Sequence, residues 1–207
     1  MISHMTLADA NTYPALFESM YEDRKKIFVD RLRWDLDHNG RKEVDNYDTS
    51  DAAYLILNDS QSGLHLGSVR LLPTTKGHIL SDVFPFLCEG EVPTGNRVWE
   101  ITRLVVSPDA KRRDRLMIRN MLGRAMIEYG LAVGIDYYTC VCEMGFLSQL
   151  LASGWHCEPL GLPQEFQGSV VGALKIRCDG KSLTQTEDIW RYDRPVLQMR
   201  APSKIAA

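Results

Sequence analysis

The chain has 207 residues, 44% of them hydrophobic, and a formal net charge of -3 at pH 7. This length suits one compact domain, and the apolar content can fill a core, which excludes a disordered segment. The interspersed charges give no indication of a nucleic-acid partner or an anionic membrane surface. Its apolar runs are too short to span a bilayer, and the N-terminus lacks the layout of a secretory signal.

An amphipathic helix is predicted over 14–32, because apolar side chains recur on one of its faces. A polar stretch rich in Asp, Asn and Gly follows over 35–51, and a loop of this length is typically functional or disordered. An irregular segment is expected over 73–95. Strands are predicted over 53–57, 64–72 and 98–106, where apolar and β-branched residues are bounded by turn residues.

The second half continues with a predicted helix over 113–133, a strand over 136–142 and a short helix over 144–152. A further strand is predicted over 169–177, whereas the segment from 189 onward has no clear pattern. We find no repeat, linker or break in composition, so we expect one domain over 1–207. Strands that alternate with helices indicate an α/β or α+β domain.

The five cysteines are odd in number and scattered, unlike a disulfide framework or paired zinc ligands. Cys140 and Cys142 are two apart in a predicted strand, so they face one side and are interpreted as small buried side chains. We therefore expect no metal site, and a cytoplasmic protein with reduced thiols.

Several charged residues lie in predicted helices and strands whose pattern is otherwise apolar. Arg24 shares a helix face with Phe28, although a long arginine stem can lie on a core with its head in water. Arg70 follows an apolar run, and Glu100 and Arg103 lie within the strand predicted over 98–106. Charges in apolar strands are costly unless paired, and removing one partner of a buried pair costs about 3–5 kcal/mol.

The loop over 35–51 supplies acids in Glu43-Val44-Asp45-Asn46-Tyr47-Asp48, close in sequence to the aromatic Trp34. A solvated acidic turn is the alternative, and the spacing of a calcium loop is absent. We expect one ionic network that lines a cavity and has three charges of each sign: Arg24, Arg70 and Arg103 against Asp45, Asp48 and Glu100. A purely structural network is the other interpretation.

These motifs, at this spacing, resemble the signature of the acyl-homoserine-lactone (autoinducer) synthase family. The resemblance rests on Arg24-x-x-x-Phe28, Trp34, Glu43-x-Asp45-x-Tyr47-Asp48, Arg70, Phe84 and Trp99-Glu100-Ile101-Thr102-Arg103. It is strong over about 20–108. The part from about 109 to 200, expected to hold the acyl chain, matches only in its order of strands and helices.

The resemblance implies an acyltransferase-like fold similar to the acetyltransferase superfamily, with a mixed, mostly antiparallel sheet split by a V-shaped cleft and flanked by helices. Ordinary acetyltransferases cradle the pyrophosphate of coenzyme A in a glycine-rich turn that opens the central helix. Residues 112–117 contain no glycine here, which weakens the case for an ordinary acetyl-coenzyme A enzyme.

The implied enzyme transfers an acyl group from a thioester to the amine of S-adenosylmethionine, then forms the lactone and releases methylthioadenosine. Both compounds are substrates, so no cofactor is implied. Glu100 is the expected general base, and the backbone N–H groups of Arg103 and Leu104 the expected oxyanion donors. Glu100 and Arg103 would face opposite sides of a regular strand, so we predict a bulge between Glu100 and Val106.

The resemblance assigns the S-adenosylmethionine site to Arg24, Phe28, Trp34, Asp45, Asp48, Arg70 and Phe84. Aromatic faces would stabilise the sulfonium, and Arg24 or Arg103 would hold the carboxylate. Asp45 and Asp48 would orient the arginines or receive the ammonium group, with Phe84 packed over the site.

The acyl chain is expected in an apolar tunnel lined by Leu122, Met126, Cys140, Cys142, Met144 and Trp155. Members that take 3-oxo chains often carry threonine where Cys142 stands, and a thiol is a weak donor, so an unsubstituted or 3-hydroxy chain is expected. The donor is left open between acyl-acyl carrier protein and acyl-coenzyme A. A basic cluster over 111–115, with Arg119 and Arg124, could dock an acidic carrier protein or could be a solvated helix start.

Two other functions remain open from the residues. One is a general N-acyltransferase that acts on a different small amine, which would leave the loop acids and Trp34 unexplained. The other is a binding domain that retains a ligand cavity without catalysis. A Glu100→Gln substitution separates them, because ligand binding would survive in a binding domain while turnover collapses in an enzyme.

Overall fold

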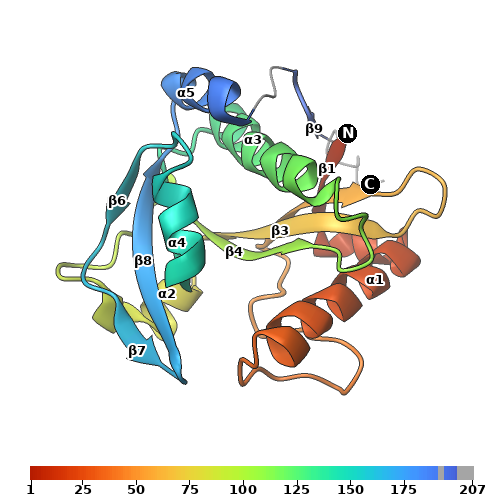
Figure 1. Ribbon diagram of the computed structural model, residues 1–207, viewed down its shortest axis with the longest axis horizontal. Coiled ribbons are helices and arrows are strands. Elements are labelled where there is room, and N and C mark those ends of the chain that lie inside the picture. The colour runs from red at the N-terminus through yellow and green to blue at the C-terminus, as the bar shows by residue number, and fades with distance from the viewer. Residues whose placement is uncertain (191–193, 200–207) are drawn as a thin grey trace, which may run out of the picture.

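The computed structural model describes residues 1–190 and 194–199 (Figure 1). Over these residues one mixed sheet of nine strands has the order β6-β8-β5-β4-β3-β2-β1-β9, with β7 paired to β8. The strands are β1 (Ile2–Thr6), β2 (Ala53–Asn58), β3 (His65–Pro73), β4 (Val98–Val106), β5 (Tyr137–Glu143), β6 (Cys157–Pro159), β7 (Gln164–Phe166), β8 (Ser169–Arg177) and β9 (Leu197–Gln198).

Helices cover both faces of this sheet. Figure 1 shows α1 on one face of the strands β3 and β4 and α3 on the other. The helices are α1 (Pro14–Arg24), α2 (Ile79–Asp82), α3 (Arg115–Val133), α4 (Met144–Leu151) and α5 (Gly180–Trp190), the 3₁₀ turns η1 (Leu7–Asn11) and η3 (Pro85–Leu87), and the π-helical segment η2 (Lys25–Arg31). None of the described helices is both long and apolar enough to cross a membrane.

The apolar run of β2 is buried on both sides because each face meets a helix layer. Leu55 and Leu57 belong to the core beneath α3, whereas Tyr54 and Ile56 belong to the core beneath α1. Side chains alternate between the faces of a strand, so a strand covered on both faces has a continuous apolar sequence. This confirms the strand predicted over 53–57.

A cleft opens where β4 and β5 stop pairing. The two strands run parallel and pair from Val98 with Tyr137 to Ile101 with Cys140. Beyond that point β4 continues along β3 to Val106, while β5 continues along β8 to Glu143. The sheet is therefore split into two halves that meet at the base of a V, as the resemblance implies.

A bulge in β4 lies at this divergence. Ser68 of β3 pairs with Val105, and Arg70 pairs with Thr102, so β4 has one residue more than β3 between these pairs. Arg103, within the bulge, has a φ of 50°, which is uncommon for a residue other than glycine. The bulge predicted between Glu100 and Val106 is confirmed.

Other predictions need adjustment. The helix expected over 14–32 is α1 followed from Lys25 by the π-helical η2, so it is not one regular α-helix. The irregular segment over 73–95 contains α2 and η3. The strands β1, β6, β7 and β9 and the helix α5 were not predicted, because most are short and border the sheet. Parts of the expected single domain and acyl-chain half, residues 191–193 and 200–207, lie outside the described residues.

At Gly67 of β3 the helix α3 packs closely on the sheet. A Cβ at this position would lie 2.6 Å from Ile118 Cγ2, 3.2 Å from Leu122 Cδ1 and 3.3 Å from the Val105 carbonyl oxygen. We predict that Gly67→Ala lowers the free energy of unfolding by about 1–3 kcal/mol, because α3 must shift to admit a methyl group. Urea denaturation measures the loss.

Gly145→Ala in α4 is the matched control, since a Cβ there meets no described atom within 4 Å. It should leave stability unchanged or raise it by up to about 1 kcal/mol, because alanine favours a helix. Equal stability of the two variants would contradict the close packing of α3 on Gly67.

Candidate active site

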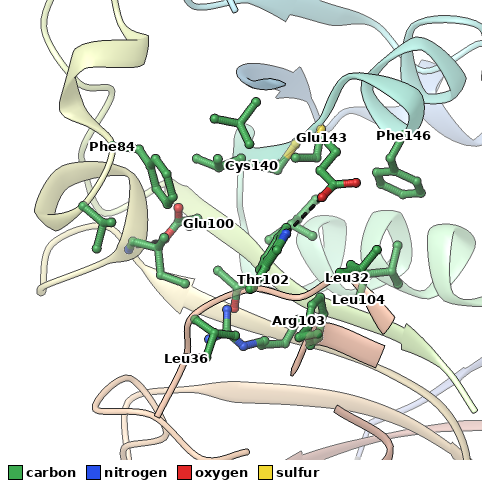
Figure 2. Close-up of a pocket in the computed structure, with 18 of the residues that line it drawn as sticks. Leu32, Leu36, Phe84, Glu100, Thr102, Arg103, Leu104, Cys140, Glu143 and Phe146 are labelled. Atoms are coloured by element: carbon green, nitrogen blue, oxygen red, sulfur yellow. Dashed lines mark hydrogen bonds between the residues drawn. The ribbon is translucent and has the colours of Figure 1, made fainter. Parts of the chain in front are cut away.

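A cavity of about 800 Å³ occupies the cleft between β4 and β5 (Figure 2). One wall is polar and comes from β4 and the loop that holds Asp45. The other is largely apolar and comes from β5, β8, α3 and α4, while the segment after η2 borders both. A volume of this size accommodates a small molecule with a chain attached.

Beneath the polar wall, Arg24 is enclosed by two carboxylates. Its Nε donates to Glu43 Oε2 at 2.6 Å, and its Nη1 and Nη2 donate to Asp48 at 2.8 and 2.9 Å. The Arg24 and Glu43 side chains are 1% and 0% exposed. The apolar stripe of the helix therefore carries this arginine into the interior rather than toward water.

Arg70 joins the network from β3. Its guanidinium donates to both oxygens of Asp45 at 2.5 and 2.9 Å, and Nη1 lies 2.9 Å from Asp48 Oδ1. Its Nε donates to Thr102 Oγ1 at 3.0 Å, which ties the arginine to β4. Arg70 thus connects the acidic loop to two strands of the sheet.

Arg103 is the third arginine, and the bulge aims it back toward the loop. Its Nη2 lies 2.9 Å from Glu43 Oε1 and 2.7 Å from Asp45 Oδ2. Its guanidinium carbon lies 5.3 Å from the centre of the Phe28 ring. Of the three network arginines, Arg103 alone lines the cavity.

The third acid of the network is Glu43, so the expectation that Glu100 fills this place is wrong. Three arginines face Glu43, Asp45 and Asp48. Burial would raise the pKa of the Asp45 and Asp48 carboxyls, but the adjacent arginines outweigh it and hold both pKa values below their usual range. The network thus pairs three arginines with three acids.

Glu100 lies apart from this network, fully buried in the cavity wall. Its Oε2 accepts the Ile79 N–H at 2.7 Å, and its Oε1 accepts the Leu80 N–H at 2.8 Å. Burial raises the pKa of Glu100 to about 7, although these two hydrogen bonds act in the opposite direction. A carboxyl with that pKa can accept and return a proton near neutral pH.

Aromatic side chains border the polar end of the cavity. The rings of Phe28 and Trp34 lie 5.3 Å apart between centres, and Trp34 Nε1 donates to Glu143 Oε1 at 3.0 Å. Phe84 lines the cavity and packs edge-on against Phe166 at 4.8 Å. The structure thus brings all three predicted aromatics to the cavity.

The apolar wall includes four of the six predicted acyl-pocket residues, namely Met126, Cys140, Cys142 and Trp155. The other two, Leu122 and Met144, do not line the cavity. Leu122 is fully buried in the core between α3 and β3, and Met144 packs on the edge of that core. Further apolar lining residues that the sequence did not single out are Val141, Phe146, Leu150 and Ile176, and Leu104, expected only as a backbone donor, lines the cavity as well.

Arg24, Asp48 and Arg70 do not line the cavity and instead hold the residues that do. Arg24 therefore lies behind the cavity wall, paired with Glu43 and Asp48. Glu143 does line it and was missed, although a charged residue at the end of an apolar strand is the same signal that indicated Glu100. The five cysteines are free thiols, and no group of His, Cys, Asp and Glu within the described ranges could hold a metal ion.

Comparisons with known proteins find similar sequences and structures. A family model described as autoinducer synthase matches residues 9–186. An acyl-homoserine-lactone synthase of Aeromonas hydrophila is 40% identical over 164 residues, 76% of this chain and 77% of the relative. An isovaleryl-homoserine lactone synthase of Bradyrhizobium diazoefficiens is 32% identical over 190 residues, 91% of this chain and 84% of the relative.

Among solved structures, BjaI is described as a CoA-dependent acyl-homoserine lactone synthase with SAM and isopentyl-CoA. It matches with a TM-score of 0.86 and 28% identity, over 98% of this chain and 94% of BjaI. The likeness therefore extends over both halves of the split sheet.

We predict that Glu43→Gln lowers the free energy of unfolding by about 3–5 kcal/mol, because it removes the charge that balances two buried arginines. Urea denaturation at neutral pH checks this. The control is Glu22→Gln, which loses a surface pair with Arg41 and should cost about 1 kcal/mol or less. A loss no greater than in the control would mean that the network contributes little to stability.

Proposed function

The chain belongs to the autoinducer synthase family, and we propose that its reaction takes place in the cavity between β4 and β5. The protein is an acyl-homoserine-lactone synthase. It transfers an acyl group from a thioester to the amine of S-adenosylmethionine, closes the lactone and releases methylthioadenosine. The product is a quorum-sensing signal.

One observation supports the proposed site: a polar wall and an apolar wall face the same cavity, around Glu100. The polar wall presents Arg103 and Asp45, which suits an amino acid with its carboxylate and ammonium groups. The apolar wall, with Cys140 and Phe146, suits a hydrocarbon chain. The amine and the thioester would meet between them, at the base of the cleft.

In this proposal Arg103 holds the substrate carboxylate, while Asp45 keeps the guanidinium in place and faces the ammonium group. Phe28 and Trp34 lie beside the sulfonium, where an aromatic face contributes about 0.5–2 kcal/mol. Phe84 lines the same cavity and packs over the site. Arg24, Asp48 and Arg70 act indirectly, by fixing the loop and Arg103.

Glu100 acts as the general base for acylation, directly or through one water molecule. It takes a proton from the ammonium, whose nitrogen then attacks the thioester carbonyl. The resulting oxyanion needs fixed donors, and the N–H groups of Arg103 and Leu104 are candidates because β4 no longer pairs with β5 at this bulge. As the intermediate collapses, the carbon–sulfur bond breaks and the second nitrogen proton passes to the departing sulfur, which forms the amide and releases the thiol.

Lactone formation follows within the same bound substrate. A carboxylate oxygen forms a bond to the γ carbon while the carbon–sulfur bond breaks, and the electron pair leaves with sulfur as neutral methylthioadenosine. Arg103 orients the attacking carboxylate in this step. The two bond changes need no electron acceptor, so we propose that the enzyme uses no cofactor.

We infer coenzyme A as the acyl carrier, because the chain matches the CoA-dependent BjaI over nearly its whole length. The chain is expected to be unsubstituted or 3-hydroxylated, since Cys142 supplies only a weak hydrogen-bond donor to the apolar wall. We place the enzyme in the cytoplasm, where its five thiols stay reduced.

Incubating the purified protein with S-adenosylmethionine and a panel of acyl-coenzyme A and acyl-carrier-protein thioesters should yield methylthioadenosine and an acyl-homoserine lactone together. Mass spectrometry identifies both products. The largest yield is expected with a coenzyme A thioester, and a yield only with carrier-protein thioesters would overturn that choice of donor. An acylated product without methylthioadenosine would point to a general N-acyltransferase.

We predict that Glu100→Gln lowers kcat by about 10²–10⁴-fold while S-adenosylmethionine still binds, because the amide cannot accept the proton. In the wild type, kcat/KM should fall as pH drops through about 7, since protonation removes the base. Steady-state rates from pH 5.5 to 9 and calorimetry measure the two effects. Full activity in Glu100→Gln would remove this residue from the base role.

The Asp82→Asn variant tests whether the fall of kcat/KM at low pH reports Glu100 or the amine of the substrate. The Asp82 charge helps to raise the pKa of Glu100, so its removal should move the acid limb of the profile to lower pH. An unchanged limb would assign the titration to the substrate rather than to Glu100.

A further inference from the structure

Glu143 lines the cavity but has no role in the proposed reaction. It is the last residue of β5 and directly precedes α4. Its Oε1 accepts hydrogen bonds from Trp34 Nε1 at 3.0 Å and from Ser169 Oγ at 3.1 Å. Both donors are neutral, and none of the ion pairs among the described residues includes Glu143, unlike the acids of the network.

The bond from Trp34 to Glu143 crosses the cleft. Trp34 follows η2, which belongs with the polar half, whereas Glu143 and Ser169 belong to β5 and β8 in the apolar half. In Figure 2 the Glu143 carboxylate points into the cavity, toward the side that carries Thr102 and Arg103. A second hydrogen bond also crosses the cleft, from the Asp35 N–H to Gln167 Oε1 at 3.4 Å.

The backbone before Trp34 is strained, so this tryptophan depends on its contacts for its position. Arg33 has a φ of 62°, a conformation that costs a non-glycine residue about 1–3 kcal/mol and persists only where the surroundings impose it. On its own side, the Trp34 N–H bonds to the Phe28 carbonyl at 3.0 Å. On the far side, the bond to Glu143 fixes the edge of the indole.

From Trp34 the contacts continue to the ionic network. The indole packs on Phe28 at 5.3 Å, and Phe28 in turn lies 5.3 Å from the Arg103 guanidinium carbon. Displacing the indole would remove the support of Phe28 and loosen the arginine at the cavity surface. Glu143, in the apolar half, is thus connected to Arg103 on the polar wall through the rings of Trp34 and Phe28.

We propose that Glu143 is a positioning residue that holds Trp34 across the cleft and thereby keeps the two substrate walls at a fixed separation. This inference rests on the proposed function, because the walls are the two substrate sites. Glu143 acts as a hydrogen-bond acceptor, and its charge makes no contact with the substrate. Loss of Glu143 should therefore weaken the binding of S-adenosylmethionine, although Glu143 belongs to the half of the sheet that would hold the acyl chain.

The test compares Glu143→Ala, Glu143→Gln, Trp34→Phe and the double variant Trp34→Phe/Glu143→Ala. Glu143→Ala should raise KM for S-adenosylmethionine and lower kcat, together by about 10–100-fold in kcat/KM, because small misplacements of substrate-positioning groups are costly. Glu143→Gln should stay within about 3-fold of wild type, since its amide oxygen can accept both bonds. KM for the acyl donor should change less than KM for S-adenosylmethionine.

Trp34→Phe keeps the ring on Phe28 but removes the indole N–H. If Glu143 acts through Trp34, the double variant should be no worse than the more severe single variant. Glu165→Gln, on the exposed strand β7 outside the cavity, is the control and should match wild type. Thermal unfolding checks whether Glu143→Ala is folded. If it is not, the test uses the other two single variants: Glu143→Gln should have activity near wild type, and Trp34→Phe should be impaired.

A Glu143→Gln variant as impaired as Glu143→Ala would overturn the proposal, because the charge rather than the bond would then matter. Additive losses in the double variant would also overturn it, since the two residues would then act independently. Failure of the proposed function is distinguishable, because the wild type itself would then form no lactone. Unchanged kinetics in all variants of an active enzyme would defeat this inference alone.

Discussion

The structure depends on the need to pair charges that have been taken out of water. Arg24 and Arg70 are about 1% exposed, and an unpaired buried guanidinium would cost several kcal/mol. Their partners Glu43, Asp45 and Asp48 come from a long polar loop that has little regular structure. Because each acid bonds an arginine of α1, β3 or β4, the loop is held against the sheet and becomes a wall of the cavity.

The environment, rather than residue type, gives the acids of the cavity different chemistry. Asp45 and Asp48 face arginines, so they stay ionised well into acid. Glu100 is more deeply buried and bonds two backbone N–H groups, and burial raises its pKa to about 7. Asp45 and Asp48 therefore keep their charge near neutral pH, whereas Glu100 can exchange a proton there. The bulge at Arg103 lets both serve one cavity.

The split of the sheet gives the cavity two walls and leaves them joined mainly at its base. The strands β4 and β5 pair over four residue pairs and then diverge. The contacts of Trp34 and Asp35 with Glu143 and Gln167 bridge the open end. A two-substrate reaction requires reacting atoms to meet at close range, so the geometry of the opening matters as much as the residues on either wall.

The amino-acid sequence was enough to predict the strands and helices with strong periodicity, the bulge in β4 and several of the residues that line the cavity. The strands, helices and bulge follow from alternation and from charge within an apolar strand, whereas the cavity residues follow from the resemblance of the motifs to the family. The fold was needed to show that Glu43 rather than Glu100 completes the network, that Leu122 faces the core, and that Glu143 bonds Trp34 across 109 positions. Charge pairing and burial depend on which segments meet in space, and sequence spacing does not specify that.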